Sequence, residues 1–234
     1  MSAGTGRTWL FDPPPRAAVS VAGENLDFPV HRVYCVGQNY RAHAREMGAS
    51  GREPPFFFAK PADAVTEARS VPYPPMTENL HHEVELVVAL AAGGRNIEPP
   101  TALDRVFGYA VGVDLTRRDL QAAAKNAGRP WTTAKGFDGS APISPLRRAG
   151  RDDHPAAAAI SLSVNGELRQ QGSTADMTWS VAEIIAELSK YFELQPGDLI
   201  FTGTPPGVGP LAPGDVVECA IEGVGTLEFR LSDH

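Results

Sequence analysis

The stretch HEVELVVAL at residues 82–90 determines the fold class. Successive side chains on a β-strand point to opposite faces of the sheet, so Glu83 and Glu85 share one face. The even-numbered positions from Val84 to Leu90 are all apolar and share the other face. This continuous apolar face predicts a strand packed on a hydrophobic core. It also leaves two carboxylates side by side in an otherwise apolar segment.

Further short apolar runs surround this strand. Gly (23) and Pro (21) are plentiful, which favours many turns and short strands over a helical bundle. Helical character is expected at residues 39–47 and 119–126, and polar connections at residues 61–79 and 147–155. The other predicted strands are residues 19–21, 32–37, 54–60, 109–115, 199–202, 216–220 and 226–231. The sequence therefore predicts a mostly β (α+β) fold with a few short helices.

Two local signals give defined elements near the middle of the chain. Strand-like runs at residues 160–164 and 168–171 flank Asn165-Gly166, and such a pair predicts a β-hairpin with a tight turn. Ser180 has Glu183 three residues later, which is the pattern of a capping box. Apolar residues at helical spacing follow, so we expect an amphipathic helix to begin at Ser180.

Length and composition limit the domain organisation and the partners. The 234 residues suffice for one domain, and we expect a leader segment at residues 1–30 followed by one domain at residues 31–234. The net charge of −7 offers no basic stripe for a nucleic acid. No apolar run approaches the roughly 20 residues of a membrane span. Residues 1–16 lack the apolar core of a signal peptide, so we expect a cytoplasmic protein.

The paired acids of the first strand have a third candidate partner. Two carboxylates on an apolar strand repel each other and lose hydration, and a hard divalent cation relieves both costs. Asp114 ends another predicted strand and could complete such a site with Glu83 and Glu85. An all-oxygen set predicts Mg²⁺ or Mn²⁺ rather than zinc, although His81 is nearby. The alternative is a solvent-facing strand whose acids bind nothing.

Three other features could carry chemistry. His43 and Glu46 lie three residues apart in a helical pattern, where a carboxylate can orient an imidazole and raise its basicity. Lys135 lies in a turn-rich, aromatic segment. A glycine-rich turn at residues 202–209 follows a strand and could offer backbone N–H groups to an anion. Taken singly, each is compatible with an exposed residue or a plain turn.

Taken together, seven segments resemble the fumarylacetoacetate hydrolase family. They occur in the family's order and span residues 33–230, nearly the whole chain. The segments are VYCVGQNYRAHAREMG, PPFFFAKP, HHEVEL, GYAVGVDLTRRDLQ, WTTAKGFD, VNGELRQ and FTGTPPGVG. The resemblance implies a mixed β-sandwich roll of the family's C-terminal-domain type, usually dimeric, with residues 31–234 as the catalytic domain. The closest likeness is to the short, single-domain acylpyruvase and fumarylpyruvate hydrolase branch.

The resemblance also implies roles for particular residues. Three sets match the family's pattern: the metal ligands Glu83, Glu85 and Asp114, for Mg²⁺ or Mn²⁺; the catalytic residues His43, Glu46 and Lys135; and the substrate contacts Arg118, Gln121 and Thr204. His43 and Glu46 match a dyad that activates water, and Lys135 a lysine near the substrate's oxygens. One residue departs from the pattern, because Gln38 stands where many relatives carry a basic residue.

The implied activity is metal-dependent hydrolysis of a C–C bond in a 2,4-dioxo acid, an acylpyruvate. Fumarylpyruvate, cleaved to fumarate and pyruvate in the degradation of aromatic compounds, is the expected substrate. One alternative is an oxaloacetate decarboxylase or a hydroxy-diene-dioate isomerase and decarboxylase acting at the same metal site. A second alternative is a protein that binds a keto acid without catalysis.

Overall fold

The computed structural model describes residues 9–40, 53–150 and 153–233. The strand that carries Glu85 is β8 (Val84–Leu90), and each of its residues is buried. It lies inside a six-stranded mixed sheet in which only β15 and β3 pair in parallel. In spatial order the strands are β12 (Arg147–Arg148), β9 (Val106–Val113), β8, β15 (Leu199–Phe201), β3 (Val33–Gly37) and β4 (Phe56–Lys60).

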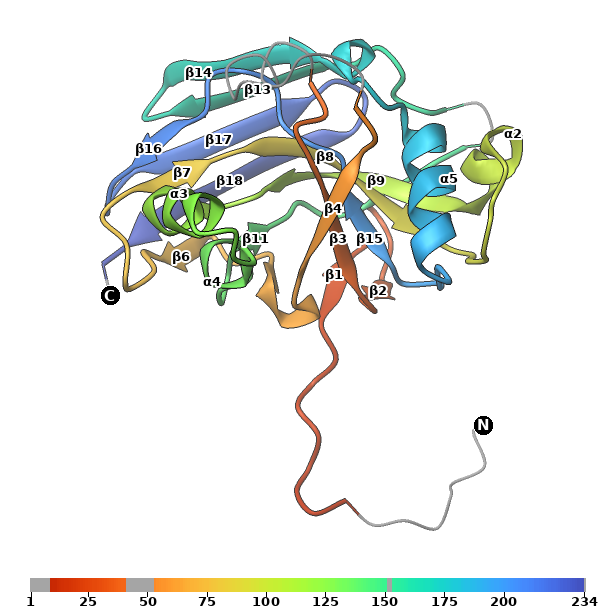
Figure 1. The fold of residues 1–234 in the computed structure, drawn as a ribbon, viewed down its shortest axis with the longest axis horizontal. Helices are drawn as coiled ribbons and strands as arrows, with labels where there is room; N and C mark the ends of the chain where they lie inside the picture. Colours follow the sequence, from red (N-terminus) through yellow and green to blue (C-terminus); the bar gives the residue numbers. More distant parts are fainter. Residues whose placement is uncertain (1–8, 41–52, 151–152, 234) are drawn as a thin grey trace.

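A second sheet of five strands covers one face of the first (Figure 1). In spatial order its strands are β14 (Glu167–Ser173), β13 (Ala159–Val164), β17 (Val216–Ile221), β18 (Gly225–Ser232) and β6 (Ser70–Pro72). The predicted hairpin is confirmed: β13 and β14 are joined by Asn165 and Gly166, with φ angles of 51° and 77°. Two consecutive positive φ angles are the requirement of the tight hairpin turn that Asn-Gly favours.

The core has two parts because β8 is buried on both faces. Val84, Leu86 and Val88 belong to the cluster between the two sheets, as the alternation predicted. The opposite face continues from Glu85 into Val87 and Ala89, which belong to a second cluster. The acidic face of β8 is therefore not exposed to solvent, and its carboxylates stand at the edge of a hydrophobic core.

Residues 18–30, which the sequence analysis set apart as part of a leader, pack into this second cluster. They form β1 (Ala18–Ser20) and β2 (Asp27–Pro29), an antiparallel pair. Val19 is 0% exposed and Phe28 is 6% exposed. Residues 9–16, which precede β1, run away from the body in Figure 1.

Two further groups of strands complete the β-structure in the described residues. One is the sheet β10 (Thr116–Arg117), β7 (Leu80–His82) and β16 (Gly209–Leu211); another is the parallel pair of β11 (Ala141–Pro142) and β5 (Val65–Thr66). The predicted connection at residues 61–79 thus contains β5, β6 and the turn η1 (Ala62–Ala64). Part of the predicted loop at residues 147–155 pairs with β9 as β12.

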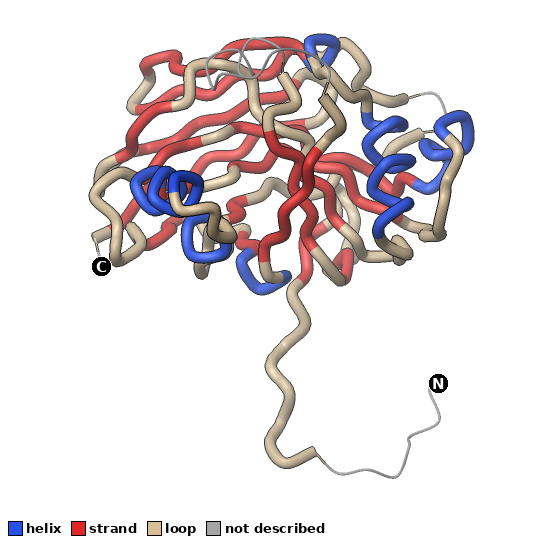
Figure 2. Tube along the Cα trace, viewed as in Figure 1, coloured by secondary structure: helices blue, strands red, loops and turns tan. Residues whose placement is uncertain are grey.

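The helices are few and short, and the two longest lie at opposite ends of the sheets (Figure 2). They are α2 (Pro99–Ala102), η2 (Leu103–Arg105), α3 (Arg118–Asn126), α4 (Thr132–Lys135), η3 (Thr174–Asp176) and α5 (Val181–Tyr191). The predicted capping box of Ser180 and Glu183 is present at the start of α5. The predicted mostly β fold class is confirmed. Within the described ranges, no helix has the length and apolar character needed to cross a membrane.

Candidate active site

Three carboxylates meet where β8 begins and β9 ends. Strands β8 and β9 are antiparallel, with Val84 opposite Val113. This register places Asp114, the residue after β9, beside Glu83, and its N–H donates to the Glu83 carbonyl at 2.8 Å. One ligand atom from each of Glu83, Glu85 and Asp114 lies within 4.8 Å of the others. The structure therefore brings together the three predicted metal ligands, each buried.

Three basic side chains surround this cluster, but they serve only two of its acids. Lys135 Nζ donates to Glu83 Oε2, Asp114 Oδ2 and Thr116 Oγ1, each at 2.7 Å. Arg118 forms an ion pair with Glu83 Oε1. Lys60 Nζ lies 2.9 Å from Asp114 Oδ1. Within the described part of the chain no ion pair reaches Glu85, whose Oε2 accepts a hydrogen bond from Gly203 N at 2.7 Å.

The pKa values of the two glutamates diverge for this reason. Burial would raise the pKa of Glu83, but Lys135 and Arg118 hold it below its ordinary value. Burial, together with repulsion from Asp114 and Glu83, raises the pKa of Glu85 well above its ordinary value. Glu85 is thus the acid of this cluster whose ionised form is least compensated by cationic side chains.

The donor set fits a hard divalent cation. Asp114 Oδ1 is buried and accepts no hydrogen bond, although Lys60 Nζ is near it. A carboxylate oxygen that accepts no hydrogen bond, beside a second carboxylate with no ion pair among the described residues, is the arrangement that a cation relieves. The two neighbouring histidines make hydrogen bonds away from the carboxylates. His81 Nε2 contacts Asn79 Oδ1 and His82 Nδ1 contacts Gln170 Oε1, both at 2.9 Å. Glu83, Glu85 and Asp114 could therefore hold Mg²⁺ or Mn²⁺ through oxygen alone.

A glycine allows the loop after β15 to approach this cluster. Gly203 has a φ of 95°, and a Cβ there would lie 2.7 Å from the Cβ of Asn39. Asn39 Nδ2 donates to the carbonyls of Thr202 at 2.8 Å and Trp179 at 3.0 Å, which holds the ends of β15 and β3 together. The glycine-rich turn proposed from the sequence thus presents its Gly203 N–H to Glu85 rather than to open solvent.

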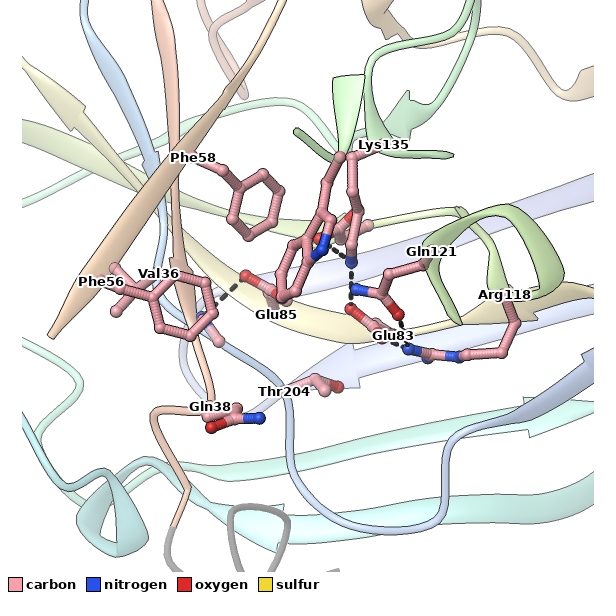
Figure 3. A pocket seen from close by; sticks show the side chains of 14 residues that line it. Val36, Gln38, Phe56, Phe58, Glu83, Glu85, Arg118, Gln121, Lys135 and Thr204 are labelled. Carbon is pink, nitrogen blue, oxygen red and sulfur yellow. Dashed lines mark hydrogen bonds and ion pairs between the residues drawn. The ribbon is translucent and has the colours of Figure 1, made fainter. Parts of the chain in front are cut away.

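The cluster forms the floor of a pocket that has an apolar wall and a polar lining (Figure 3). Its apolar wall is formed by Val36, Phe56, Phe58 and Trp131. Its polar lining includes Gln38 and the three predicted substrate contacts, Arg118, Gln121 and Thr204. The structure therefore gathers the described candidate residues around one cavity.

Arg118 is held in place from two sides. Its Nη1 donates to Gln121 Oε1, and its Nε lies 3.3 Å from His81 Nδ1. Burial and the charge of Arg118 lower the pKa of His81 to about 4, so this ring is neutral at pH 7 and can accept the hydrogen bond. The side chain of Arg118 is thereby oriented before any substrate arrives.

Two of the predicted catalytic residues, His43 and Glu46, lie outside the described residues. The third, Lys135, uses its three ammonium hydrogens on Glu83, Asp114 and Thr116, so a direct bond to substrate would require exchanging one of them. Sequence reasoning assigned no role to Lys60, although the matching segment PPFFFAKP contains it. A lysine that ends an apolar strand was the available signal.

We expect Lys135→Met to lower the free energy of unfolding of the metal-free protein by about 3–5 kcal/mol, because breaking a buried ion pair leaves an unpaired charge in the interior. The loss is measured by urea unfolding in EDTA. Lys125→Met, at an exposed position of α3, is the control and should change stability by less than about 0.5 kcal/mol. Equal stability of the two variants would mean that Lys135 does not balance the carboxylates.

Comparison with known proteins agrees with this geometry. Residues 32–232 match the family model for the fumarylacetoacetate (FAA) hydrolase C-terminal domain. The crystal structure of fumarylpyruvate hydrolase from Pseudomonas aeruginosa, in complex with Mn²⁺ and pyruvate, is 50% identical, covers 97% of this chain and 100% of that one, and superposes with a TM-score of 0.94. The resemblance seen in the sequence and the expected family fold are both confirmed.

Other similar proteins have different activities in their names. The oxaloacetate tautomerase YcgM of Escherichia coli K12 is 44% identical over 86% of this chain and 93% of its own length. The crystal structure of 5-carboxymethyl-2-hydroxymuconate delta-isomerase from Mycobacterium smegmatis is 33% identical, covers 88% of this chain and 81% of that one, and has a TM-score of 0.78. Proteins similar to this chain therefore carry hydrolase, tautomerase and isomerase names.

Proposed function

This chain belongs to the fumarylacetoacetate hydrolase family, and from that premise we propose that it hydrolyses a C–C bond of a 2,4-dioxo acid with the help of Mg²⁺ or Mn²⁺. Fumarylpyruvate, cleaved to fumarate and pyruvate, is the proposed substrate. The observation that carries the proposal is the buried cluster of Glu83, Glu85 and Asp114 on the floor of a pocket lined by cationic and aromatic side chains. The likeness in sequence and fold to the fumarylpyruvate hydrolase supports the choice of substrate.

In this proposal, some residues of the site bind the metal and the substrate, and others stabilise the charges of the carboxylates. A divalent cation, when bound by the three carboxylates, supplies Lewis-acid polarisation of the keto acid and stabilises developing negative charge. Arg118 and Thr204 offer donors to the substrate's carboxylate. The aromatic wall around Phe58 and Trp131 limits the access of bulk water, which strengthens these electrostatic interactions. Lys135 keeps Glu83 ionised and holds both Glu83 and Asp114 in place by hydrogen bonds.

We assign the activation of water for hydrolysis to His43 and Glu46. In this proposal His43, oriented by Glu46, removes a proton from a water molecule that attacks the C4 carbonyl carbon. The C3–C4 bond then breaks, and its electron pair passes to C3 to give the enolate of pyruvate. The enolate takes up a proton, and the products are pyruvate and a carboxylic acid. A base is required because neutral water attacks a ketone slowly.

The alternative is enolate chemistry on oxaloacetate or a hydroxy-diene dioate at the same site. Tautomerisation and decarboxylation also pass through an enolate, but neither needs a hydrolytic water. The named activities of similar proteins favour this alternative as a second candidate. The deciding test compares kcat/KM for fumarylpyruvate, maleylpyruvate, acetylpyruvate and oxaloacetate with Mg²⁺ or Mn²⁺. An oxaloacetate value well above all three acylpyruvate values would replace the hydrolase assignment.

Gln38 is the pocket residue that we expect to contact the distal end of the substrate, where fumarylpyruvate carries its second carboxylate. It lines the pocket with a left-handed backbone (φ 57°), a conformation that a non-glycine residue adopts at a cost and that is common in functional sites. We expect Gln38→Arg to raise the ratio of kcat/KM for fumarylpyruvate over acetylpyruvate by about 10–100-fold, because only the former carries a distal carboxylate to pair with the arginine.

The control for this prediction is Gln171→Arg, which adds the same charge at an exposed position of β14. It should leave the substrate ratio unchanged. An unchanged ratio in Gln38→Arg would show that the distal group of the substrate lies elsewhere in the pocket.

We also propose that the protein is a homodimer, on the strength of the family resemblance. The outer edge of the six-stranded sheet supports this, because β4 lacks a partner strand on that side within the described residues. Exposed aromatic side chains accompany the edge, including Phe56 (39% exposed), Tyr191 (65%) and Phe192 (40%). Light scattering at micromolar concentration should give twice the chain mass, and a value near 24.9 kDa would contradict the proposal.

A further inference from the structure

A buried glutamine, outside every residue assigned a role above, connects three segments of the site. Gln170 is 0% exposed, and it lies on β14, most of whose residues are exposed or half-buried. The pairing of β13 with β14 shifts register between Leu162 and Ser163, which leaves Arg169 without an opposite residue. Such a bulge redirects the neighbouring side chain, and here that side chain is Gln170.

The amide of Gln170 has all of its hydrogen-bonding partners. Its Oε1 accepts from Val84 N at 3.1 Å and lies 2.9 Å from His82 Nδ1. Its Nε2 donates to Thr204 Oγ1 at 2.8 Å and to Pro205 O at 2.9 Å. The opposite orientation of the amide would set an NH₂ group against the Val84 N–H and an oxygen against the Pro205 carbonyl. The backbone on both sides therefore fixes which end faces Thr204.

The orientation of this amide determines what the Thr204 hydroxyl can do. Gln170 Nε2 can only donate, so Thr204 Oγ1 accepts from it and cannot direct its own hydrogen toward it. In the described residues the Thr204 hydroxyl makes no other hydrogen bond, and the side chain lines the pocket beside the acidic cluster. Its hydrogen is thus available to an acceptor inside the pocket.

We propose that Gln170 is a positioning residue that commits the Thr204 hydroxyl to donate its hydrogen to an anionic oxygen of the bound keto acid. The proposal rests on the proposed function, because it requires a carboxylate ligand in the pocket. The close approach of the two segments supports it. Gly207, in the loop after Thr204, has a φ of 95°, and a Cβ there would lie 2.2 Å from the carbonyl oxygen of Arg169.

The test is Gln170→Glu, which keeps the shape of the side chain and reverses the polarity toward Thr204. A protonated Glu can still accept from Val84 N–H and His82, and its hydroxyl can donate to the Pro205 carbonyl. Its remaining lone pair then accepts from Thr204, which turns that hydrogen away from the pocket. An ionised Glu accepts from Thr204 in the same way.

The readout is the affinity for pyruvate, measured by calorimetry with saturating Mn²⁺. We expect Gln170→Glu and Thr204→Val each to weaken pyruvate binding by about 10–100-fold, the range for a hydrogen bond to a charged group. In the Thr204→Val background, Gln170→Glu should add less than about 3-fold, because the hydroxyl through which it acts is gone. Thr204→Ser keeps a hydroxyl and should restore most of the affinity, and Gln171→Glu, on the exposed face of β14, is the matched control.

Three results separate the possibilities. If Gln170→Glu weakens pyruvate equally with and without the Thr204 hydroxyl, Gln170 acts by another route and the proposal is wrong. Unaltered pyruvate affinity in Thr204→Val overturns it even if Gln170→Glu does not fold. If the unaltered protein binds Mn²⁺ but no pyruvate, and turns over no keto acid, then the proposed function is wrong and the role of Gln170 falls with it.

Discussion

Glu85→Gln should abolish Mn²⁺ binding and at the same time make the metal-free protein more stable. Among the described residues, no cationic side chain forms an ion pair with Glu85, which is a buried acid of the cluster. Burial and repulsion from Asp114 and Glu83 raise the pKa of Glu85. Replacing it with a neutral side chain of the same shape removes this repulsion. It also removes a ligand, so the same change should improve folding and eliminate function.

Glu83→Gln should have the opposite effect on the stability of the metal-free protein. Glu83 is paired with both Lys135 and Arg118, so its replacement breaks a buried network of ion pairs. Without metal it should lower the free energy of unfolding by about 3–5 kcal/mol. Two isosteric changes two residues apart on one strand should therefore shift stability in opposite directions, while both lose Mn²⁺. Glu218→Gln, at an exposed position of β17, is the neutral control.

The expected activity loss for Glu85→Gln is roughly 10³-fold, because electrophilic assistance by a metal is worth several kcal/mol and each 1.36 kcal/mol is tenfold in rate. Mn²⁺ binding is followed by electron paramagnetic resonance, and stability by urea unfolding in EDTA. Treating the unaltered protein with EDTA should reproduce the activity loss, and Mg²⁺ or Mn²⁺ should reverse it. Full activity of Glu85→Gln after EDTA treatment would exclude the metal site.

The raised pKa of Glu85 has a further consequence for the metal-free protein. A carboxyl group whose pKa is higher in the folded state binds its proton more tightly there than in the unfolded chain. Folding stability then decreases as the pH rises above the ordinary pKa of a glutamate, since the unfolded state releases the proton first. This part of the pH dependence should be missing from Glu85→Gln.

The sequence was most informative where neighbouring residues determine the structure. The alternation in β8 predicted its core face, Asn165-Gly166 predicted the hairpin, and Ser180 with Glu183 predicted the start of α5. Each of these signals acts within a few residues, so side-chain alternation, turn conformation or capping suffices to read it.

What the sequence did not predict depends on contacts between distant segments. Lys60 approaches Asp114 only because β4 ends near the end of β9, across 54 residues of sequence. Gln170 reaches Val84 across 86 residues, through a bulge that nothing in VNGELRQ reveals. The packing of β1 and β2 on the second core cluster was missed because their short apolar runs show no partner in the sequence.

The contacts of Lys135 add to the role that the resemblance implied for it. The resemblance placed this lysine near the oxygens of the substrate, and it does line the pocket. Its three hydrogen bonds, however, hold Glu83, Asp114 and Thr116. Its contribution in the structure is to hold these carboxylates in place, and a residue pattern alone cannot show which of several nearby oxygens an ammonium group contacts.

His43→Ala should reduce hydrolysis of an acylpyruvate by roughly 10²–10⁴-fold, the usual contribution of a general base. Glu46→Gln should lower the same reaction by a smaller factor, because it removes the partner that orients the imidazole. Decarboxylation of oxaloacetate needs an electron sink and no nucleophilic water, so both variants should retain most of it.

Both reactions are measured for both variants at saturating Mg²⁺, with Mn²⁺ affinity determined in parallel to confirm that the cluster is intact. Glu85→Gln is the comparison, since loss of a metal ligand should reduce hydrolysis and decarboxylation together. The ratio of the two rates is therefore the quantity that distinguishes water activation from electrophilic assistance. An equal fall of both rates in His43→Ala and Glu46→Gln, with metal affinity unchanged, would mean that the dyad positions the substrate, and a general base for hydrolysis would have to be sought among other residues of the pocket.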